Sequence, residues 1–218
     1  SHRSHAFVDI MDESCDLVLE LLDLKRSDYT PLFLQGGASM QFLMTAYNFL
    51  KNEAAFLNTG TWSKKAIKEA ELFGAVDVLG TSENDNFNHI PKFNISKEYD
   101  YFHCTSNNTI FGTQINNFPE TSVPIFCDMS SDIFSRKLNF SKFDLIYAGA
   151  QKNLGPAGAT LVIIKNKLLN NIKDDVPSMM NYKIQADKSS MFNTPPVFSV
   201  YVSMLNMRWL KKMGGISE

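Results

Sequence analysis

Short apolar runs alternate with segments of helical periodicity along most of this chain. The first such unit has an apolar run at residues 31–34, a Gly36-Gly37 turn and helical spacing of apolar residues over 39–50. Alternation of this kind builds a parallel or mixed sheet that is covered by helices. The runs that predict strands occupy residues 31–34, 54–57, 76–79, 101–104, 123–127, 145–147 and 160–164. We therefore predict an α/β fold around a multi-stranded sheet.

Apolar residues at spacings of three and four predict the helices that flank this sheet. They mark residues 6–24, 39–50, 62–73 and 196–213, and the Gly214-Gly215 pair is expected to cap the last of these helices. Between residues 80 and 97 the chain is polar and rich in Asn, with no clear periodicity, so we expect a long surface loop there.

Composition narrows the class of protein and of partner. The chain has 218 residues, of which 44% are hydrophobic and 20% charged, and this is typical of a globular protein with a sizeable core. Its 21 Lys and Arg residues against 23 Asp and Glu residues give a net charge of -2. This balance gives no electrostatic argument for binding nucleic acid or an anionic membrane, so a small-molecule substrate is the expected partner.

The cysteines and the apolar runs indicate whether the chain binds a metal and in which cellular compartment it works. Cys15, Cys104 and Cys127 have no metal-ligand spacing, and the last two lie in runs that predict buried strands. We expect them to be reduced core residues. No stretch approaches the roughly 20 apolar residues of a membrane span, and the first residues lack the basic and apolar regions of a signal peptide. These features predict a cytoplasmic protein without a metal site.

The most informative segment runs from Tyr147 to Gly158 and carries a single lysine, Lys152, between two predicted strands. Glycines and alanines surround this amine, and such small residues let another molecule approach the backbone closely. A lysine in a turn is most often a solvated surface residue, and that alternative stands beside the functional one. The density of small residues favours an amine that meets a ligand.

The run Ala148-Gly149-Ala150-Gln151-Lys152-Asn153, followed by Gly155-Pro156-Ala157-Gly158, resembles the cofactor-lysine segment of the phosphoserine aminotransferases. Members of this family use pyridoxal 5′-phosphate (PLP). The similarity extends from Ser1-His2-Arg3 to Trp209-Leu210. Further matching motifs are Leu34-Gln35-Gly36-Gly37, Thr61-Trp62-Ser63, Ala66-Ile67-Lys68-Glu69-Ala70, Asn107-Asn108-Thr109-Ile110 and Phe192-Asn193-Thr194-Pro195-Pro196.

The resemblance implies the large domain of a fold-type I PLP enzyme, which has a mixed, mostly parallel seven-stranded sheet flanked by helices. Residues 1–218 would form this PLP-binding domain. Because the chain opens at Ser1 without a methionine and closes at Glu218, where a turn should lead into another element, we expect both ends to be truncated. The family's small C-terminal domain, which contributes an arginine for the substrate α-carboxylate, would then be absent.

The chemistry of PLP gives three matched residues their expected tasks. Lys152 would hold the cofactor covalently and then move a proton between the substrate α-carbon and the cofactor. Asp128, directly after the run 123–127, would keep the pyridine nitrogen protonated through an ion pair. Trp62 resembles the tryptophan that stacks on the ring. Taken alone, Asp128 could equally cap the turn at Ser130-Ser131, and Trp62 could be a core residue.

The phosphate of PLP needs an anion site, and a helix N-terminus preceded by glycines supplies one. Gly36-Gly37 forms such a cradle, although a plain tight turn has the same signature. The resemblance adds Ala38 and Ser39 as phosphate contacts, Gln151 nearby and Thr109 as a hydrogen-bonding group on the cofactor. Many relatives carry arginine where Ser39 stands, so hydrogen bonds rather than charge would hold the phosphate here.

Members of the family are homodimers whose active sites lie at the interface between the subunits. Asn193 and Thr194 resemble the pair that reaches the phosphate from the neighbouring subunit. His2 and Arg3 resemble residues that bind an acid group of the substrate, also across the dimer, and a guanidinium suits a carboxylate or a phosphate. A solvated chain end or a tag remnant is the alternative for His2.

The implied reaction moves an amino group from L-glutamate to 3-phosphohydroxypyruvate, a phosphorylated 2-oxo acid, and gives phosphoserine and 2-oxoglutarate. Serine biosynthesis is the implied pathway, with pyridoxine biosynthesis as a further role. One alternative is another PLP aminotransferase or a desulfurase of the same fold. The other is a catalytically silent binding or assembly protein. Nucleotide binding at Gly36-Gly37 is disfavoured because no lysine-serine pair or three-glycine fingerprint follows.

Overall fold

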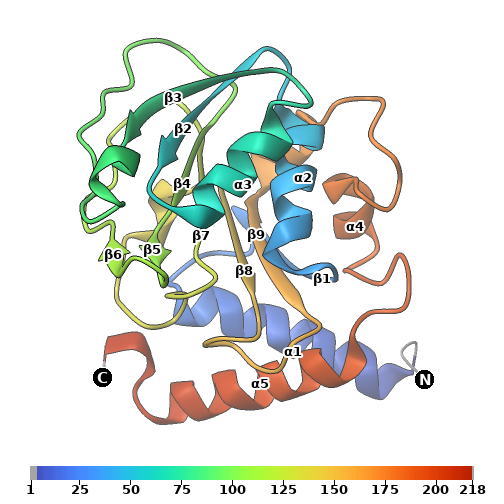
Figure 1. Cartoon of the computed structure of the whole chain (residues 1–218). Helices are drawn as coiled ribbons and strands as arrows, with labels where there is room; N and C mark the ends of the chain where they lie inside the picture. The colour runs from blue at the N-terminus through green and yellow to red at the C-terminus, as the bar shows by residue number, and fades with distance from the viewer. Residues whose placement is uncertain (1–3, 218) are drawn as a thin grey trace.

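A seven-stranded sheet forms the centre of the computed structural model, which describes residues 4–217 (Figure 1). The strand order is β1-β9-β8-β7-β4-β2-β3. β9 runs antiparallel to both of its neighbours, and the pairs from β8 through to β3 are parallel. The strands are β1 (Tyr29–Leu34), β2 (Glu53–Asn58), β3 (Ala75–Thr81), β4 (Phe102–Thr105), β7 (Ile125–Asp128), β8 (Leu145–Gly149) and β9 (Thr160–Lys165). The mixed, mostly parallel seven-stranded sheet is thus confirmed.

Both faces of the sheet are buried along β4, β7, β8 and β9, which explains why these strands are almost continuously apolar in sequence, whereas the edge strand β3 is partly exposed. Successive side chains of a strand point to opposite faces. In β9, Leu161 and Ile163 belong to one hydrophobic cluster, whereas Val162 and Ile164 belong to the other. The sheet therefore needs helices on both sides.

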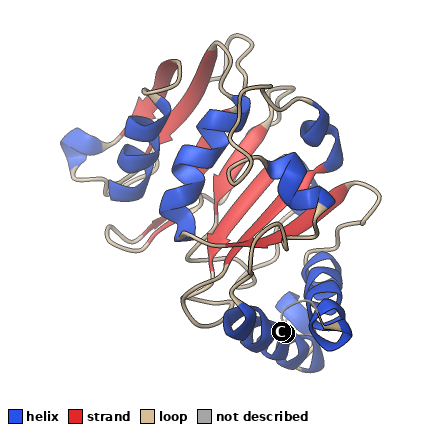
Figure 2. Ribbon diagram, turned by 90° about the vertical axis from the view of Figure 1, so that its right-hand side faces the viewer, coloured by secondary structure: helices blue, strands red, loops and turns tan. Residues whose placement is uncertain are grey.

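Helices cover both faces of the sheet (Figure 2). α1 (His5–Leu21) and α5 (Val197–Lys212) pack together on one face of the sheet. α2 (Gly37–Phe49), α3 (Thr61–Ala70) and α4 (Tyr182–Asp187) cover the other face. The connections place the N-termini of α2 and α3 directly after β1 and β2, at the edge where these strands end.

Several element boundaries differ from those expected. The helix expected over 6–24 ends at Leu21 because Asp23 takes a left-handed φ of 53°, and the N–H of Leu24 bonds the carbonyl of Leu19 at 2.9 Å. The helix expected over 62–73 ends at Ala70. Helix α4 and the hairpin of β5 (Asn107–Asn108) and β6 (Thr113–Gln114) were not expected from the sequence. The described chain also has short 3-10 helices at Glu83–Asp85, Phe140–Lys142, Asn166–Asn170 and Gly215–Ser217.

The three cysteines are free and buried, as expected for core residues. Within residues 4–217 we find no helix with the length and apolar character that a bilayer span requires. The expectation of a long surface loop over 80–97 holds in large part, since the segment after β3 and the 3-10 helix is irregular.

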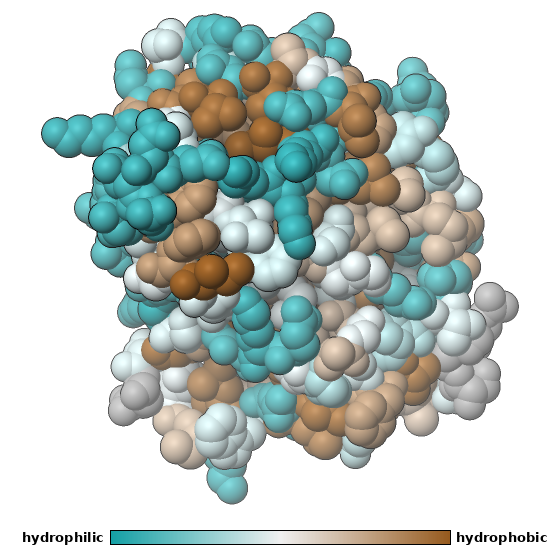
Figure 3. Space-filling view, in the orientation of Figure 1, coloured by the Kyte–Doolittle hydropathy of each residue, from teal (hydrophilic) through white to brown (hydrophobic). Residues whose placement is uncertain are grey.

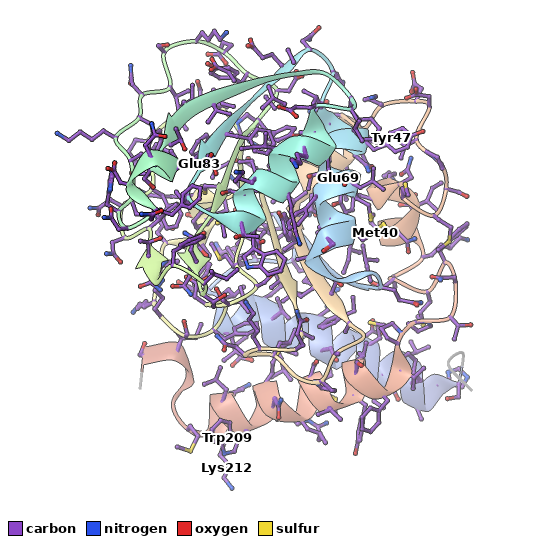
Figure 4. The ribbon with its side chains drawn as sticks, in the orientation of Figure 1. Met40, Tyr47, Glu69, Glu83, Trp209 and Lys212 are labelled. Atoms are coloured by element: carbon purple, nitrogen blue, oxygen red, sulfur yellow. The ribbon has the colours of Figure 1, made fainter. Side chains whose placement is uncertain are left out.

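Helix α5 exposes several large apolar side chains among polar ones. Polar and apolar side chains mix along the lower edge of the molecule, where α5 lies (Figure 3). Trp209 and Lys212 project from this helix away from the sheet (Figure 4). The exposed large apolar residues of α5 are Val197, Phe198, Tyr201, Leu205 and Trp209.

Phe126 in β7 offers a direct test of the core. Its side chain is fully buried, and its ring stacks on Tyr101 with centroids 4.4 Å apart. Because Phe126→Ala leaves a cavity in the middle of the sheet, we expect the free energy of unfolding to fall by about 3–5 kcal/mol. Urea denaturation measures this change, with Phe126→Leu as the milder control. A loss below about 1 kcal/mol would contradict the packing described here.

Candidate active site

Three neighbouring parallel strands end at one edge of the sheet. β4, β7 and β8 end there at Thr105, Asp128 and Gly149, and α2 and α3 begin beside them. Ligands of open α/β sheets bind at the carboxyl ends of the strands. A cleft of about 160 Å³ lies at this edge, lined by Gly37, Ala38, Ser39, Trp62, Thr105, Asn107, Asp128, Ser130, Ser131, Gln151 and Lys152.

Lys152 lies in the turn between β8 and β9. Its side chain is exposed and lines the cleft together with Asp128 and Trp62. The Nζ atom lies 3.4 Å from Oγ1 of Thr109, on the turn of the β5-β6 hairpin. The structure therefore brings together the amine, the carboxylate and the indole that the sequence singled out.

Asp128 is the buried carboxylate of the cleft, with only 4% of its surface exposed. Burial raises its pKa, while hydrogen bonds from Ser130 and the charge of Lys152 oppose this rise. The N–H and Oγ of Ser130 both donate to Oδ1, at 2.9 and 2.6 Å. Asp128 thus caps its own turn and also presents a carboxylate to the cleft, so the two interpretations of this residue are compatible.

Ser130 links Asp128 to the end of β8. Its hydroxyl donates to Asp128 and also accepts the N–H of Gly149 at 3.2 Å. Ser131, the next residue, donates from Oγ to the carbonyl of Asn107 at 2.8 Å. The turn after β7 therefore connects β5 with the ends of β7 and β8.

Trp62 forms one wall of the cleft at the start of α3. The hydroxyl of Ser63 accepts the N–H groups of Thr59 and Gly60, both at 2.9 Å, and so fixes where this helix begins. The Nζ of Lys65 lies 4.7 Å from the centroid of the indole. Among the described residues the buried Nε1 of Trp62 has no hydrogen-bond partner. The residue is a cleft wall rather than a fully buried core side chain.

The N-terminus of α2 closes another side of the cleft. Gly36 and Gly37 take φ values of 92° and 68°, in the left-handed region that favours glycine. The first turn of a helix leaves N–H groups without intrahelical partners, and these attract anions. Ala38 and Ser39 line the cleft at this point. Lys152 is the one basic residue among those that line the cleft in the described chain, so an anion here would be held mainly by hydrogen bonds.

Gln151 also lies where it was expected. Its side chain packs so closely on Gly149 that a Cβ atom at Gly149 would lie 2.5 Å from Oε1 of Gln151. A larger residue at this position would displace Gln151 from the cleft. The absence of a side chain at Gly149 therefore leaves the room that Gln151 occupies.

Other expected residues lie elsewhere. Asn193 lines a separate cleft with Gly36 and Met40, and the carbonyl of Thr194 accepts a hydrogen bond from Gln35 at 2.6 Å. Their contact with the phosphate in a neighbouring subunit stays a prediction. His2 and Arg3 lie outside the described residues.

Four residues of the cleft are not indicated as site residues by the sequence pattern. These are Thr105, Asn107, Ser130 and Ser131. Thr105 could have been found from its place at the end of a predicted strand, next to the edge that carries Asp128. The sequence marks the two serines only as part of a turn that Asp128 caps.

The donor set of the cleft fits PLP. A cofactor with an aldehyde, a basic ring nitrogen and a phosphate needs an amine, a carboxylate, a flat wall and an anion site. Lys152, Asp128, Trp62 and the N-terminus of α2 supply these four groups around one cleft. The chemistry of the residues present therefore suits this cofactor.

Comparison with known proteins decides the family. A family model described as aminotransferase class-V matches residues 1–217. The chain belongs to the class-V aminotransferases. Two curated relatives of this class-V aminotransferase, the phosphoserine aminotransferases of Flavobacterium psychrophilum and Flavobacterium johnsoniae, are each 58% identical to it over 220 residues. These matches cover 100% of this chain and 62% of each relative, so the chain spans about three fifths of their length.

Solved structures agree with this family. The phosphoserine aminotransferase from Bacillus circulans subsp. alkalophilus superposes with a TM-score of 0.95 at 41% identity, over 100% of this chain and 62% of that one. PLP-bound phosphoserine aminotransferase from Trichomonas vaginalis gives a TM-score of 0.92 at 33% identity, over 99% of this chain and 62% of that one.

We predict that Trp62→Ala weakens binding of PLP by about tenfold, since the resemblance places the cofactor ring against this indole. Titration followed by absorbance measures the dissociation constant. Trp62→Phe keeps an aromatic face and should lose less affinity. Trp209→Phe, on the exposed face of α5, should leave the affinity unchanged. Equal affinities for PLP in the Trp62→Ala variant and the parent chain would refute this role.

Proposed function

We propose that this chain is the PLP-binding part of a phosphoserine aminotransferase, which moves an amino group between L-glutamate and 3-phosphohydroxypyruvate in serine biosynthesis. One observation carries the proposal: Lys152, Asp128 and Trp62 line a single cleft at the N-terminus of α2. The 58% identity to a curated phosphoserine aminotransferase, which extends over the whole chain, supports the choice of reaction.

PLP, when bound, supplies a ring that withdraws electrons from the α-carbon of the substrate. The Nζ of Lys152 would hold the cofactor and, once the amine of the substrate has displaced it, would take and return the proton of that α-carbon. Thr109 orients this amine, since its Oγ1 lies 3.4 Å from Nζ. The exposure of Lys152 toward the cleft suits a group that must reach both the cofactor and a substrate.

Asp128 holds a positive charge at the ring nitrogen. A carboxylate that is 4% exposed gains a strong ion pair when a cation lies against it, because little water competes. Ser130 occupies Oδ1, and no hydrogen bond to Oδ2 is found among the described residues. This carboxylate would hold the protonated ring nitrogen of the cofactor.

The proposal includes a cytoplasmic homodimer with shared active sites. Asn193 and Thr194 lie outside the cleft of their own chain, which is compatible with a contact to the neighbouring subunit's cofactor. His2 and Arg3 would bind the acid group of the substrate in the same way. L-glutamate and the phosphorylated 2-oxo acid are the proposed small-molecule partners.

Amino donors test the reaction. The chain is loaded with PLP, and single amino acids are added while the absorbance of the bound cofactor is followed. We expect L-glutamate to convert the spectrum and 3-phosphohydroxypyruvate to restore it, while L-alanine and L-cysteine have little effect. A response to cysteine alone would favour a desulfurase. Bound PLP that responds to no amino acid would favour a silent binding protein.

A further inference from the structure

The position of the Lys152 amine depends on the turn that carries it. The side chain is exposed, and its hydrogen bond within the described chain is the 3.4 Å contact with Thr109. Beyond this contact, the region that the amine can reach is set by where the backbone of Lys152 lies. Whatever holds the backbone of residues 150–158, which we call the lysine turn, therefore places the amine.

Helix α5 holds two carbonyl groups of the lysine turn. The Nδ2 of Asn206 donates to the carbonyl of Leu154 at 3.0 Å. The Oγ of Ser199 donates to the carbonyl of Ala157 at 2.6 Å. These bonds join residues separated by 52 and 42 positions in the chain, so they tie the turn to a distant element rather than to itself.

Glycines bring the lysine turn close to α5. A Cβ atom at Gly155 would lie 2.6 Å from Oγ of Ser203, and a Cβ atom at Gly158 would lie 2.6 Å from Oγ of Ser199. Both distances are shorter than van der Waals contact, so side chains at these positions would push the turn away from the helix. The hydroxyl of Ser203 is itself buried and has no hydrogen-bond partner among the described residues.

α5 is a firm support because α1 anchors it. Val200, Met204 and Met207 of α5 are buried in the cluster that includes α1. Arg208 and Lys211 form ion pairs with Glu13 and Glu20 of α1. Because the lysine turn is hydrogen-bonded to α5, the packing of α5 on α1 determines where this turn lies.

We propose that Asn206 and Ser199 are positioning residues for Lys152: through the carbonyls of the lysine turn, α5 sets where the amine meets the cofactor. This inference rests on the proposed function for its chemistry, and on the contacts of α5 for its geometry. Neither residue touches the cleft. Their effect on Lys152 passes through the backbone.

Variants that remove the donors test the proposal. Asn206→Asp keeps the shape of the side chain but cannot donate, and Ser199→Ala loses its hydroxyl. Misplacing a reacting group by a fraction of an ångström slows reaction strongly, so we expect the double variant to be trapped on Lys152 by PLP and borohydride about tenfold more slowly. Peptide mass mapping follows the trapping. Ser203→Ala is the matched control, since it lies on the same helix face and makes no hydrogen bond to the turn.

Two substitutions that first create and then relieve a clash between the lysine turn and α5 give a second, independent test. Gly155→Ala should slow trapping because the new methyl group meets Oγ of Ser203, and adding Ser203→Ala should restore much of the parental rate. Gly155 does not have a positive φ, so alanine fits its backbone. Any stability lost to the clash would be restored as well, so the rates are compared at a temperature where every variant is folded. Melting temperatures identify any variant that is merely unfolded.

Hydrogen exchange in the PLP-free chain separates this inference from the proposed function. The N–H of Gly155 bonds the carbonyl of Ala150 at 2.8 Å, and its exchange should rise about tenfold in the double variant and stay parental in Ser203→Ala. Parental exchange and parental trapping in the folded double variant would overturn the positioning role. A parent chain that never attaches PLP to Lys152 would overturn the proposed function, while exchange would still decide the role of α5.

Discussion

Lys152→Ala abolishes covalent attachment of PLP while the fold persists: this is the largest effect that we expect. The substitution removes the one amine that lines the cleft among the described residues. Amino transfer should fall by about 10³-fold or more, since the group that moves the proton is lost. The free energy of unfolding should change by no more than about 0.5 kcal/mol because the side chain is exposed. Absorbance of bound PLP and urea denaturation measure the two quantities.

Lys68→Ala is the matched control for this experiment. Lys68 is an exposed lysine of α3 that does not line the cleft. The control variant should bind PLP and transfer amino groups as the parent does. Covalent attachment that survives in Lys152→Ala with full stoichiometry would show that another lysine carries the cofactor.

Asp128→Asn should lower the rate of amino transfer while raising the stability of the PLP-free chain. The amide keeps the shape of the side chain and can still accept the hydrogen bonds of Ser130, but it cannot hold a positive charge at the ring nitrogen. We expect amino transfer to fall by about 10²–10³-fold. The PLP-free chain should become more stable by about 1 kcal/mol at neutral pH, because a buried carboxylate is no longer desolvated. Steady-state kinetics and urea denaturation give the two values.

The pH dependence of this stability gain has a definite sign. Burial raises the pKa of Asp128 above its ordinary value of 3.8. The protonated carboxyl group therefore contributes stability in acid, below 3.8, and this contribution is lost as the pH rises through the folded-state pKa. Asparagine does not ionise, so the advantage of Asp128→Asn should grow from acid to neutral pH. An advantage that shrinks over this interval would contradict a buried, desolvated carboxylate.

The central sheet could be predicted because its signal is local. Strands that are buried on both faces are apolar along their length, as β9 is, and glycine turns separate them from the helices. Lys152 was found for a similar reason, since the small residues around it form one continuous segment. Asp128 and Trp62 follow from their places after a strand and at the start of a helix, once the resemblance gives them a task.

The missed features depend on contacts between distant segments. The short hairpin of β5 and β6 is held partly by Ser131, which lies 24 positions from Asn107. The bond between Asn206 and Leu154 spans 52 positions, and no periodicity in either segment indicates it. Helix α4 is short, and the hydroxyl of its Tyr182 donates to Oε1 of Gln41 at 2.6 Å, across 141 positions of the chain. Such contacts appear only when the chain is folded.

Borohydride reduction of the PLP-loaded chain, followed by peptide mass mapping, tests the central claim most directly. A cofactor held opposite Asp128 and against Trp62 should leave a pyridoxyl group on Lys152 and on no other lysine. A pyridoxyl group on a different lysine, or none at all in the folded chain, would contradict the assignment of this cleft.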